Sequence, residues 1–353
     1  MARHLASVQV VHRIKPIPDA DRIEIALVLG WQCVVEKGKF KVGDKAVYFE
    51  IDSFLPEKEE FEFLRKSSFK DSDILGKGFK LKTQKFRGCI SQGLLMPLDE
   101  LGITDDLEVG TDLTEQLGIV KWEVAERATT GGTIIGTLPD FIPKTDETRI
   151  QSQPDLIDDF EDKLFYISTK MDGSSHSVGL DSEGVFHVCG HNYEYKDDDK
   201  SSFYRFVKKN EIEEKLRKYL PMMGFLGKEI KTIAIQGEFY GEGIQKNRLK
   251  LKQPVWYVFT VKVNDERIDL LKMICVCFML GLDFVPIEEY GTNLKMKYPD
   301  VDSLLLRAAG NYENAGPKEG IVVRPVYPCY NEKICASLSF KVINNQFLLK
   351  NED

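Results

Sequence analysis

The chain has 353 residues, of which 42% are hydrophobic and 29% are charged, and its formal net charge is −8. A chain of this length has room for two domains with separate cores, and the composition is typical of a soluble globular protein. The acidic balance argues against a protein coated in positive potential, so any contact with nucleic acid is expected to be local.

Cysteine usage and the apolar runs bear on where the protein resides. The seven cysteines show no paired zinc spacing, and Cys275 and Cys277 lie in an apolar run where buried thiols are more common than metal ligands. Residues 1–13 lack the apolar core of a signal peptide, and the longest apolar stretch, 273–285, is too short to span a bilayer. We therefore expect an intracellular, soluble protein that makes no membrane contact, and we expect a monomer.

Residues 1–120 have the pattern of short strands separated by turn residues. Apolar runs predict strands at 5–11, 23–29, 31–35, 46–51 and 93–97. This pattern is typical of a small β-barrel of the oligonucleotide-binding (OB) type, although a structural barrel of another type fits the strands equally well. Residues 57–73 are charged and compatible with a helical insertion between strands.

A basic segment between Gly76 and Gly88 favours nucleic-acid binding by this domain. It holds five cations and no acid: Lys77, Lys80, Lys82, Lys85 and Arg87. Phe79 and Phe86 are interleaved with these cations. Because lysines follow phosphates while bases stack on aromatic rings, the mixture suits a nucleic-acid strand. A solvated basic hairpin is the alternative.

The pattern changes after a turn-rich stretch. Residues 121–145 are predicted to be a linker, because they contain the run 128–133 and two prolines within 138–143. The domain 146–353 follows with longer strands, predicted at 164–170, 174–180, 185–189, 232–236, 255–263, 320–326 and 338–343, and helices at 201–220, 266–281 and 300–309. We predict an α+β fold, an OB-type barrel followed by a domain of antiparallel sheets flanked by helices.

The first strand of this domain ends in Lys170-Met171-Asp172-Gly173. A lysine, one residue and then Asp-Gly is the nucleophile motif of enzymes that carry a nucleotide on a lysine nitrogen, and the glycine lets the chain turn under the phosphates. So short a motif also occurs by chance, and the alternative is a surface lysine before an Asp-Gly turn.

Further polar residues follow in chain order. Glu238 stands at the predicted end of a strand, Phe259 lies within the next strand, and Glu319 and Lys341 belong to the last two. Glycines beside an acid let a ligand approach and leave the carboxylate free for a ribose hydroxyl or a hydrated metal, and an aromatic ring can stack on a base. Each residue alone has an ordinary structural explanation, but the ordered series is far less probable by chance.

The series Lys170–Gly173, Gln236–Glu238, Phe259, Glu319–Val323 and Phe340–Lys341 resembles motifs I, III, IIIa, IV and V of the covalent nucleotidyltransferases, which are the ATP-dependent ligases and capping enzymes. The chain resembles more closely the Naegleria and Deinococcus type of RNA ligase, with its N-terminal OB domain, in the segments Gly43–Asp52, Arg87–Leu94 and Arg149–Gln151. This resemblance implies an ATP-dependent, AMP-forming RNA ligase that seals 3′-hydroxyl and 5′-phosphate ends through lysyl-AMP in RNA repair.

The resemblance also implies roles for particular residues. Lys170 would attack the α-phosphate of ATP and hold AMP, and Lys341 would neutralise that phosphate. Asp172, Glu238 and Glu319 would surround hydrated Mg²⁺ or Mn²⁺. The nucleotide pocket would be lined by Arg149, Gln151, Thr169, Gly173, Asn192, Glu238, Phe259, Glu319 and Lys341, with Phe259 stacked on adenine. The partner would be RNA ends, as a nicked RNA duplex or an RNA/DNA hybrid.

Two positions depart from the family pattern. His191 precedes Asn192 where an arginine is common, and Lys341 is the one lysine present where motif V usually has two. Lys333 and Arg324 are candidates for the missing charge. A second basic stripe, at Lys246, Arg248, Lys250 and Lys252, suits a phosphate backbone if it occupies one strand face, with a solvated face as the alternative.

The alternatives are a capping-type guanylyltransferase, a DNA ligase, or a nucleic-acid-binding protein without catalysis. Capping enzymes and most DNA ligases carry a further domain after motif V, whereas about a dozen residues follow Lys341 in this sequence. Loss of catalysis would show first at Lys170, Glu238 or Glu319, and all three are present.

Overall fold

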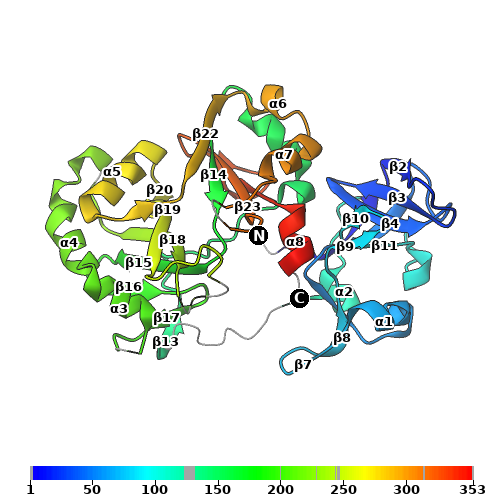
Figure 1. Cartoon of the computed structure of the whole chain (residues 1–353), viewed down its shortest axis with the longest axis horizontal. Coiled ribbons are helices and arrows are strands. Elements are labelled where there is room, and N and C mark those ends of the chain that lie inside the picture. Colours follow the sequence, from blue (N-terminus) through cyan, green and yellow to red (C-terminus); the bar gives the residue numbers. More distant parts are fainter. Residues whose placement is uncertain are drawn as a thin grey trace. The chain divides into compact units, whose positions relative to one another are not determined.

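The computed structural model describes residues 3–122, 132–198, 200–227, 229–242, 244, 247–312 and 315–351 (Figure 1). Two compact units divide the chain. The first comprises Met1–Ala125, Ile150–Pro154 and Asn345–Asp353, and the second comprises Glu126–Arg149 and Asp155–Asn344. Two short segments of the predicted range 146–353 thus group with the first unit. The domain boundaries at 120 and 145 stay a prediction, and residues 123–131 of the predicted linker lie outside the described residues.

Short antiparallel sheets build the first unit. One sheet contains β1 (Ala6–Val10), β5 (Lys45–Phe49) and β11 (Leu94–Met96), and another contains β2 (Arg13–Pro16), β3 (Ile23–Val28) and β4 (Trp31–Glu36). A four-stranded sheet contains, in order, β12 (Val120–Lys121), β6 (Ser53–Pro56), β8 (Gly76–Lys80) and β7 (Phe69–Ser72). The strands β9 (Gln84–Phe86) and β10 (Cys89–Ser91) form a separate pair. Apolar alternation explains β4, in which Trp31, Cys33 and Val35 are buried and the residues between them are less so. The five predicted strands are all present.

The first unit also contains short helices. They are η1 (Glu59–Leu64), α1 (Arg65–Ser68), η2 (Asp99–Leu101), α2 (Thr114–Leu117), η3 (Ile150–Ser152) and α8 (Asn345–Asn351). The predicted helical insertion at 57–73 therefore contains η1, α1 and then β7. The insertion packs against the rest of the first unit, because Phe61 and Leu64 are buried in the same apolar core as Phe49 and Phe79.

The basic segment does not form one hairpin. β8 pairs with β6 and β7, whereas β9 pairs with β10. Phe79 is fully buried, and the Lys80 amine lies 5.2 Å from the centre of the Trp122 ring. The prediction that Phe79 stacks on bases is therefore wrong, because its side of β8 faces the core. Lys85, Phe86 and Arg87 are exposed.

Two larger sheets form the second unit. The eight-stranded sheet holds β13 (Ile134–Thr137), β17 (Tyr193–Tyr195), β16 (Phe186–Cys189), β15 (Ser174–Leu180), β18 (Ile233–Tyr240), β19 (Val255–Val263) and β20 (Glu266–Arg267) in that order, with β21 (Asp283–Phe284) beside β19. The four-stranded sheet runs β22 (Ile287–Thr292), β14 (Leu164–Lys170), β23 (Gly320–Pro325) and β26 (Phe340–Ile343), and β24 (Tyr330–Asn331) pairs with β25 (Ala336–Ser337).

Helices cover the outside of these sheets, as Figure 1 shows for α3 (Ser202–Lys209), α4 (Ile212–Tyr219) and α5 (Leu270–Leu280) beside the eight-stranded sheet. The others are α6 (Leu294–Lys297), α7 (Val301–Ala308), η4 (Pro154–Phe160), η5 (Leu220–Met222) and η6 (Gly224–Leu226). One helix was predicted over 201–220, but it breaks at Glu211, whose φ is 53°. The predicted α+β architecture is confirmed.

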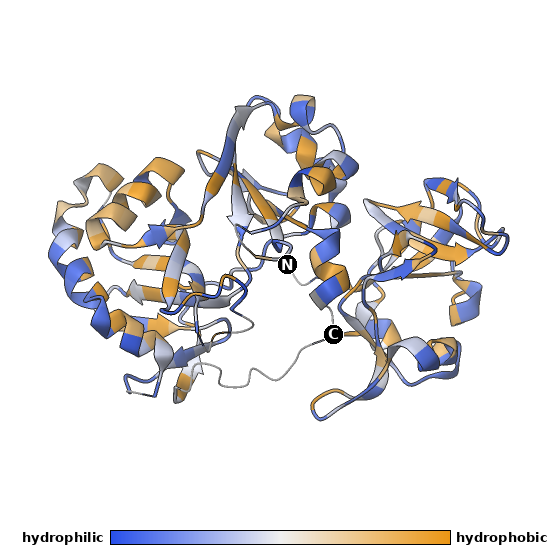
Figure 2. Cartoon of the chain, in the orientation of Figure 1, coloured by the Kyte–Doolittle hydropathy of each residue, from blue (hydrophilic) through white to orange (hydrophobic). Residues whose placement is uncertain are grey.

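The core of the second unit lies between the eight-stranded sheet and its helices. Figure 2 shows α5 as hydrophobic along most of its length, and Met273, Val276 and Leu280 are buried against the strand residues Val258 and Val261. Among the described residues, no helix is long and apolar enough to cross a membrane.

Candidate active site

Antiparallel pairing brings together the lysine and one acid of the predicted site. Lys170 is the last residue of β14, and it pairs with Gly320, the first residue of β23. Glu319 therefore stands beside the nucleophile position, and its Oε1 lies 2.7 Å from Lys170 Nζ. The two side chains are 25% and 16% exposed, so the pair is accessible to a ligand while partly shielded from water.

Glu238 reaches the same motif from the other sheet. The Gly173 N–H donates to Glu238 Oε1 at 3.0 Å. Glu238 was predicted at the end of a strand, but this is wrong, because β18 continues to Tyr240. A glycine was predicted at position 173 because the chain turns there, but the structure gives a different reason. A Cβ at Gly173 would lie 2.5 Å from the Phe239 carbonyl oxygen, so only glycine lets the motif lie this close to β18.

Asp172 is the third carboxylate, and it has a cationic partner that the sequence motif does not contain. Arg248 Nε donates to Asp172 Oδ2, and each side chain is 19% exposed. Arg248 was predicted in a basic strand face, but no strand of the second unit contains Arg248, Lys250 or Lys252. Lys246 lies outside the described residues.

The carboxylates set the protonation of the site. Burial lowers the pKa of Lys170, but attraction to Glu319, Glu238 and Asp172 outweighs burial, so the pKa is raised. Burial, helped by repulsion from Glu319 and Asp172, raises the pKa of Glu238 to about 8 despite attraction to Lys170. The net effect of these surroundings is therefore to keep the Lys170 amine protonated.

The charge balance fits a divalent cation. Lys170 pairs with Glu319 and Arg248 pairs with Asp172, whereas burial, followed by repulsion from Glu319 and Asp172, raises the pKa of the third carboxylate, Glu238. Among the described residues, no three His, Cys, Asp or Glu side chains are arranged to ligate a metal directly. The chemistry of the three carboxylates suits a hydrated Mg²⁺ or Mn²⁺, because Mg²⁺ keeps several of its water molecules and binds few carboxylates directly.

Phe259 occupies a β-bulge. Gln236 pairs with Thr260 and Gly237 with Val258, so Phe259 is the extra residue of β19. The Arg324 guanidinium lies 5.6 Å from the centre of the Phe259 ring, and the half-buried ring packs in the cluster that contains Met171. Bulges redirect side chains, and here the bulge places the ring in the same cluster as the residue after the nucleophile.

The last strand carries Lys341 beside Arg149. The Lys341 N–H donates to the Thr148 carbonyl at 2.8 Å, and an isolated parallel bridge joins Arg149 to Lys341. Gln151, two residues after Arg149, groups with the first unit, where its carbonyl accepts a hydrogen bond from the Gly30 N–H at 2.8 Å. Its side-chain amide is buried and has no hydrogen-bond partner among the described residues. The structure thus joins Arg149 to Lys341 and groups Gln151 apart from both.

Two other predicted pocket residues lie near the sheet ends. Thr169 Oγ1 donates to Glu288 Oε1 at 2.7 Å. Asn192 lies half-buried at the bend between β16 and β17, and the neighbouring His191 Nε2 is 3.8 Å from Asp146 Oδ2.

Both candidates for the missing positive charge of motif V, Arg324 and Lys333, form ion pairs with carboxylates. Arg324 is 3% exposed and pairs with Glu147. Lys333 pairs with Asp155 at 3.1 Å and with Asp159 at 2.9 Å. Both cations therefore have structural partners of their own.

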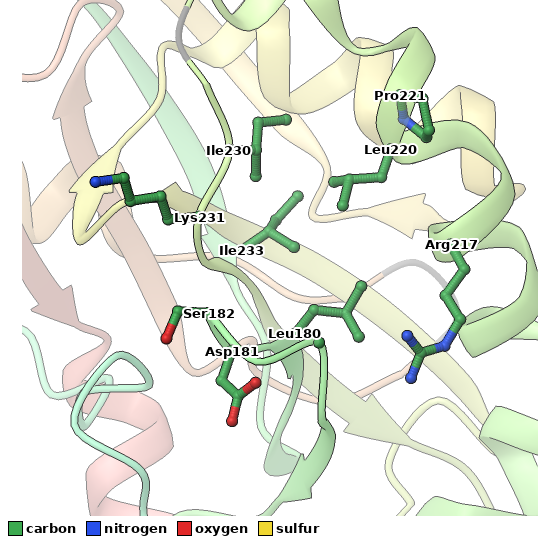
Figure 3. Close-up of a pocket in the computed structure, with 10 residues that line it drawn as sticks. Leu180, Asp181, Ser182, Arg217, Leu220, Pro221, Ile230, Lys231 and Ile233 are labelled. Atoms are coloured by element: carbon green, nitrogen blue, oxygen red, sulfur yellow. The ribbon is translucent and has the colours of Figure 1, made fainter.

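A cavity of 330 Å³ in the second unit is separate from these residues (Figure 3). Figure 3 shows Leu180, Leu220 and Ile233 directed into it, with Arg217 to one side. Leu180 ends β15, whose opposite end, Ser174, adjoins the lysine motif. The cavity thus lies at the far end of the strand from Lys170.

Comparisons with known proteins agree with this organisation. A family model described as RNA ligase matches residues 163–343, and one described as an OB-fold domain matches residues 5–98. Naegleria gruberi RNA ligase with PPi is 32% identical with a TM-score of 0.85, and the match covers 100% of both chains. A mutant of that ligase with ATP and Mn is 32% identical with a TM-score of 0.86, covering 99% of this chain and 100% of the other. A further mutant, with AMP and Mn, is 32% identical with a TM-score of 0.85 and 99% coverage of each chain. A search of curated proteins found no match.

An OB-fold domain ahead of a nucleotidyltransferase domain defines a class of nucleic-acid ligases. The chain belongs to the RNA ligase family, and it is similar to the Naegleria enzyme over nearly all of both chains. The predictions of an OB-type domain, of an RNA ligase of the Naegleria type and of an ATP-dependent ligase are confirmed.

Proposed function

We propose that this RNA ligase seals RNA ends that carry a 3′-hydroxyl and a 5′-phosphate, in the repair of broken RNA, through AMP held covalently on Lys170. One observation carries the proposal. The Lys170 amine lies 2.7 Å from Glu319, and Glu238 and Asp172 also raise its pKa. An amine among three carboxylates suits attack on a nucleotide phosphate that arrives with a divalent cation. Since solved relatives carry ATP or AMP with Mn, we infer ATP and Mg²⁺ or Mn²⁺ as the cofactors here.

The reaction proceeds by three displacements at phosphorus. The neutral Lys170 amine attacks the α-phosphate of ATP, so that an N–P bond forms as the P–O bond to pyrophosphate breaks. The 5′-phosphate of the RNA then attacks the same phosphorus, and the N–P bond breaks to restore the lysine. Finally the RNA 3′-hydroxyl attacks the activated 5′-phosphate, which forms the phosphodiester and releases AMP.

The surrounding residues bind and orient the reacting groups. Glu319 orients the Lys170 amine, and the Gly173 N–H fixes Glu238. A bound divalent cation would supply positive charge where the α-phosphate becomes more negative. Lys341 would add charge at that phosphate, and Phe259 would stack on adenine.

Sealing is tested with an RNA duplex that contains one nick, incubated with ATP and Mg²⁺ or Mn²⁺. We expect a full-length strand when the nick carries a 3′-hydroxyl and a 5′-phosphate, and none with a 5′-hydroxyl, because no phosphate is then present to accept AMP. Replacing the 3′-hydroxyl strand by DNA measures the preference for RNA. A chain that forms lysyl-AMP but seals none of these ends would contradict the proposal.

A further inference from the structure

A β-bulge turns one carboxylate of β22 out of the alternation of its strand. Ile167 pairs with Glu289 and Ser168 pairs with Ile287, so Glu288 is the extra residue between them. Bulges of this kind redirect a side chain and are common next to active sites. Glu288 was not predicted as a site residue, because its segment, Ile287–Thr292, matches none of the motifs of the sequence.

The Glu288 carboxylate binds the residues that directly precede the reactive pair. Thr169 Oγ1 donates to its Oε1 at 2.7 Å, and Lys318 Nζ donates to its two oxygens at 2.6 and 2.7 Å. Arg307 Nη1 donates to Oε2 at 2.7 Å. Lys318 is 7% exposed, so the contact with Glu288 compensates a charge that is largely removed from water. One carboxylate therefore joins the chain just before Lys170 to the chain just before Glu319.

Tyr312 joins the same two chain segments through their backbones. Its hydroxyl donates to the Lys170 carbonyl at 2.9 Å and accepts from the Glu319 N–H at 3.2 Å. The side chain is 7% exposed and packs with Met171 and Val285, so the ring is held in place.

We propose that Glu288 and Tyr312 are positioning residues that hold Lys170 and Glu319 in the geometry of nucleotide transfer, a role that rests on the proposed function of Lys170. The ladder between β14 and β23 ends at the pair of Lys170 and Gly320. Glu319 lies one residue outside it, so its position depends on contacts other than that ladder. The two positioning residues supply such contacts, one through side chains and one through the backbone.

The chemistry makes this positioning consequential. In-line attack at phosphorus requires the amine close to the α-phosphate, and a displacement of about 1 Å can lower a rate on the order of 100-fold. Neither Glu288 nor Tyr312 contacts the Lys170 amine. Their loss therefore lowers the rate of transfer at saturating ATP and leaves the affinity for ATP nearly unchanged.

The sharpest test removes one oxygen atom. In Tyr312→Phe the ring remains but both hydrogen bonds are lost, and we expect lysyl-AMP to form about 10-fold more slowly at saturating ATP, with half-saturating ATP within about 2-fold of wild type. Tyr298→Phe is the matched control. The Tyr298 hydroxyl donates to Glu289 at 2.9 Å and its side chain is 8% exposed, but it contacts neither segment, so wild-type rates are expected.

A second pair of variants tests the carboxylate. Glu288→Gln keeps an acceptor for Thr169 but loses its charge toward Lys318 and Arg307, and we expect a similar slowing of about 10-fold. Glu289→Gln is its control, because Glu289 binds Lys297, Tyr298 and Arg307 without contacting Thr169 or Lys318. Lys318→Met should slow transfer by a smaller factor in the Glu288→Gln protein than in the wild-type protein. The reason is that Glu288→Gln has already weakened the interaction that the two side chains share.

The outcomes separate this inference from the proposed function. Wild-type rates in both Tyr312→Phe and Glu288→Gln overturn the positioning role. Equal slowing in the two controls overturns it as well, because the effect is then a general loosening of the fold. A raised half-saturating ATP concentration with an unchanged maximal rate assigns the residues to ATP binding and also overturns it. If wild-type protein forms no adduct, the proposed function itself fails.

Discussion

Lys170 holds its proton more firmly than a free lysine does, because nearby carboxylates outweigh the effect of burial on its pKa. Glu319 is the strongest of these neighbours, followed by Glu238 and Asp172. A lysine is a nucleophile only when it is neutral, so the same carboxylates that suit a cation also oppose release of the amine. Binding of a divalent cation would offset them and favour the neutral amine.

Removing the charge of Glu319 tests this electrostatic account. In Glu319→Gln we expect the pKa of Lys170 to fall, because a raising influence is lost while the burial that lowers the pKa remains. The rate of Lys170 acylation by an amine-specific reagent, followed against pH by peptide mass spectrometry in metal-free buffer, measures this pKa. An unchanged or raised midpoint would contradict the account.

The residues of the motifs were predictable, but their partners were not. Glu238 and Glu319 each adjoin a glycine, and Lys170 lies three residues before Gly173, so each belongs to a short characteristic pattern that local sequence reveals. The ion pair of Asp172 with Arg248 joins positions 76 residues apart, and Tyr312 acts from a loop without a motif. Such contacts depend on how the chain returns after long separations, and neither composition nor periodicity encodes that path.

At the scale of elements, the C-terminal end of β18 was predicted wrongly because of a glycine. Gly237 beside Glu238 suggested the end of a strand, yet β18 runs from Ile233 to Tyr240. A Cβ at Gly237 would lie 2.5 Å from the Trp256 indole nitrogen, so this glycine makes room for a neighbouring ring inside the sheet. Apolar runs correctly predicted strands such as 255–263 but missed β22, and the reason for a glycine depends on the strand beside it.

A buried histidine in β15 makes the stability of the second unit depend on pH. His176 is fully buried, with its ring stacked 4.4 Å from that of Phe203, and burial lowers its pKa to about 3. The unfolded chain takes up this proton near pH ~6.5. Stability from this group is therefore complete above about pH 6.5 and is lost as pH falls toward 3, by up to about 1.4 kcal/mol per pH unit.

His176→Phe should flatten this dependence, because phenylalanine keeps the stacking and cannot take up a proton. We expect the difference in urea midpoint between about pH 7 and pH 5 to be smaller in the variant than in wild type. Loss of the hydrogen bond from His176 to the Cys189 carbonyl lowers the variant's stability at every pH, so the slope is the relevant quantity. Equal slopes in the two proteins would contradict the prediction.

At the scale of the whole molecule, a net charge of −8 makes the exposed cations of the first unit informative. Lys85 and Arg87 are exposed on either side of Phe86, which is 41% exposed. We predict that Lys85→Ala with Arg87→Ala weakens binding of nicked RNA and reduces the magnitude of its salt slope by about 2, while lysyl-AMP formation stays at the wild-type rate. Binding measured across salt concentrations checks this, and an unchanged slope would contradict it.

The division of the chain into units could be predicted only in part. Strand spacing separated an OB-type domain from an α+β domain, but short segments join the first unit through contacts distant in sequence. Ser152 Oγ donates to Glu50 at 2.5 Å, and Gln92 Nε2 donates to Asn345 Oδ1 at 3.2 Å. These bonds span 102 and 253 residues, so local patterns could not indicate them.

The most direct test of the central claim is the intact mass of the protein after incubation with ATP and Mg²⁺ or Mn²⁺, beside Lys170→Ala. The account predicts that the wild-type chain, first stripped of bound nucleotide, gains the mass of one AMP, and that Lys170→Ala gains nothing while still binding ATP. An adduct on Lys170→Ala would contradict the assignment of the nucleophile. A wild-type chain that gains no nucleotide with either metal would contradict covalent catalysis altogether.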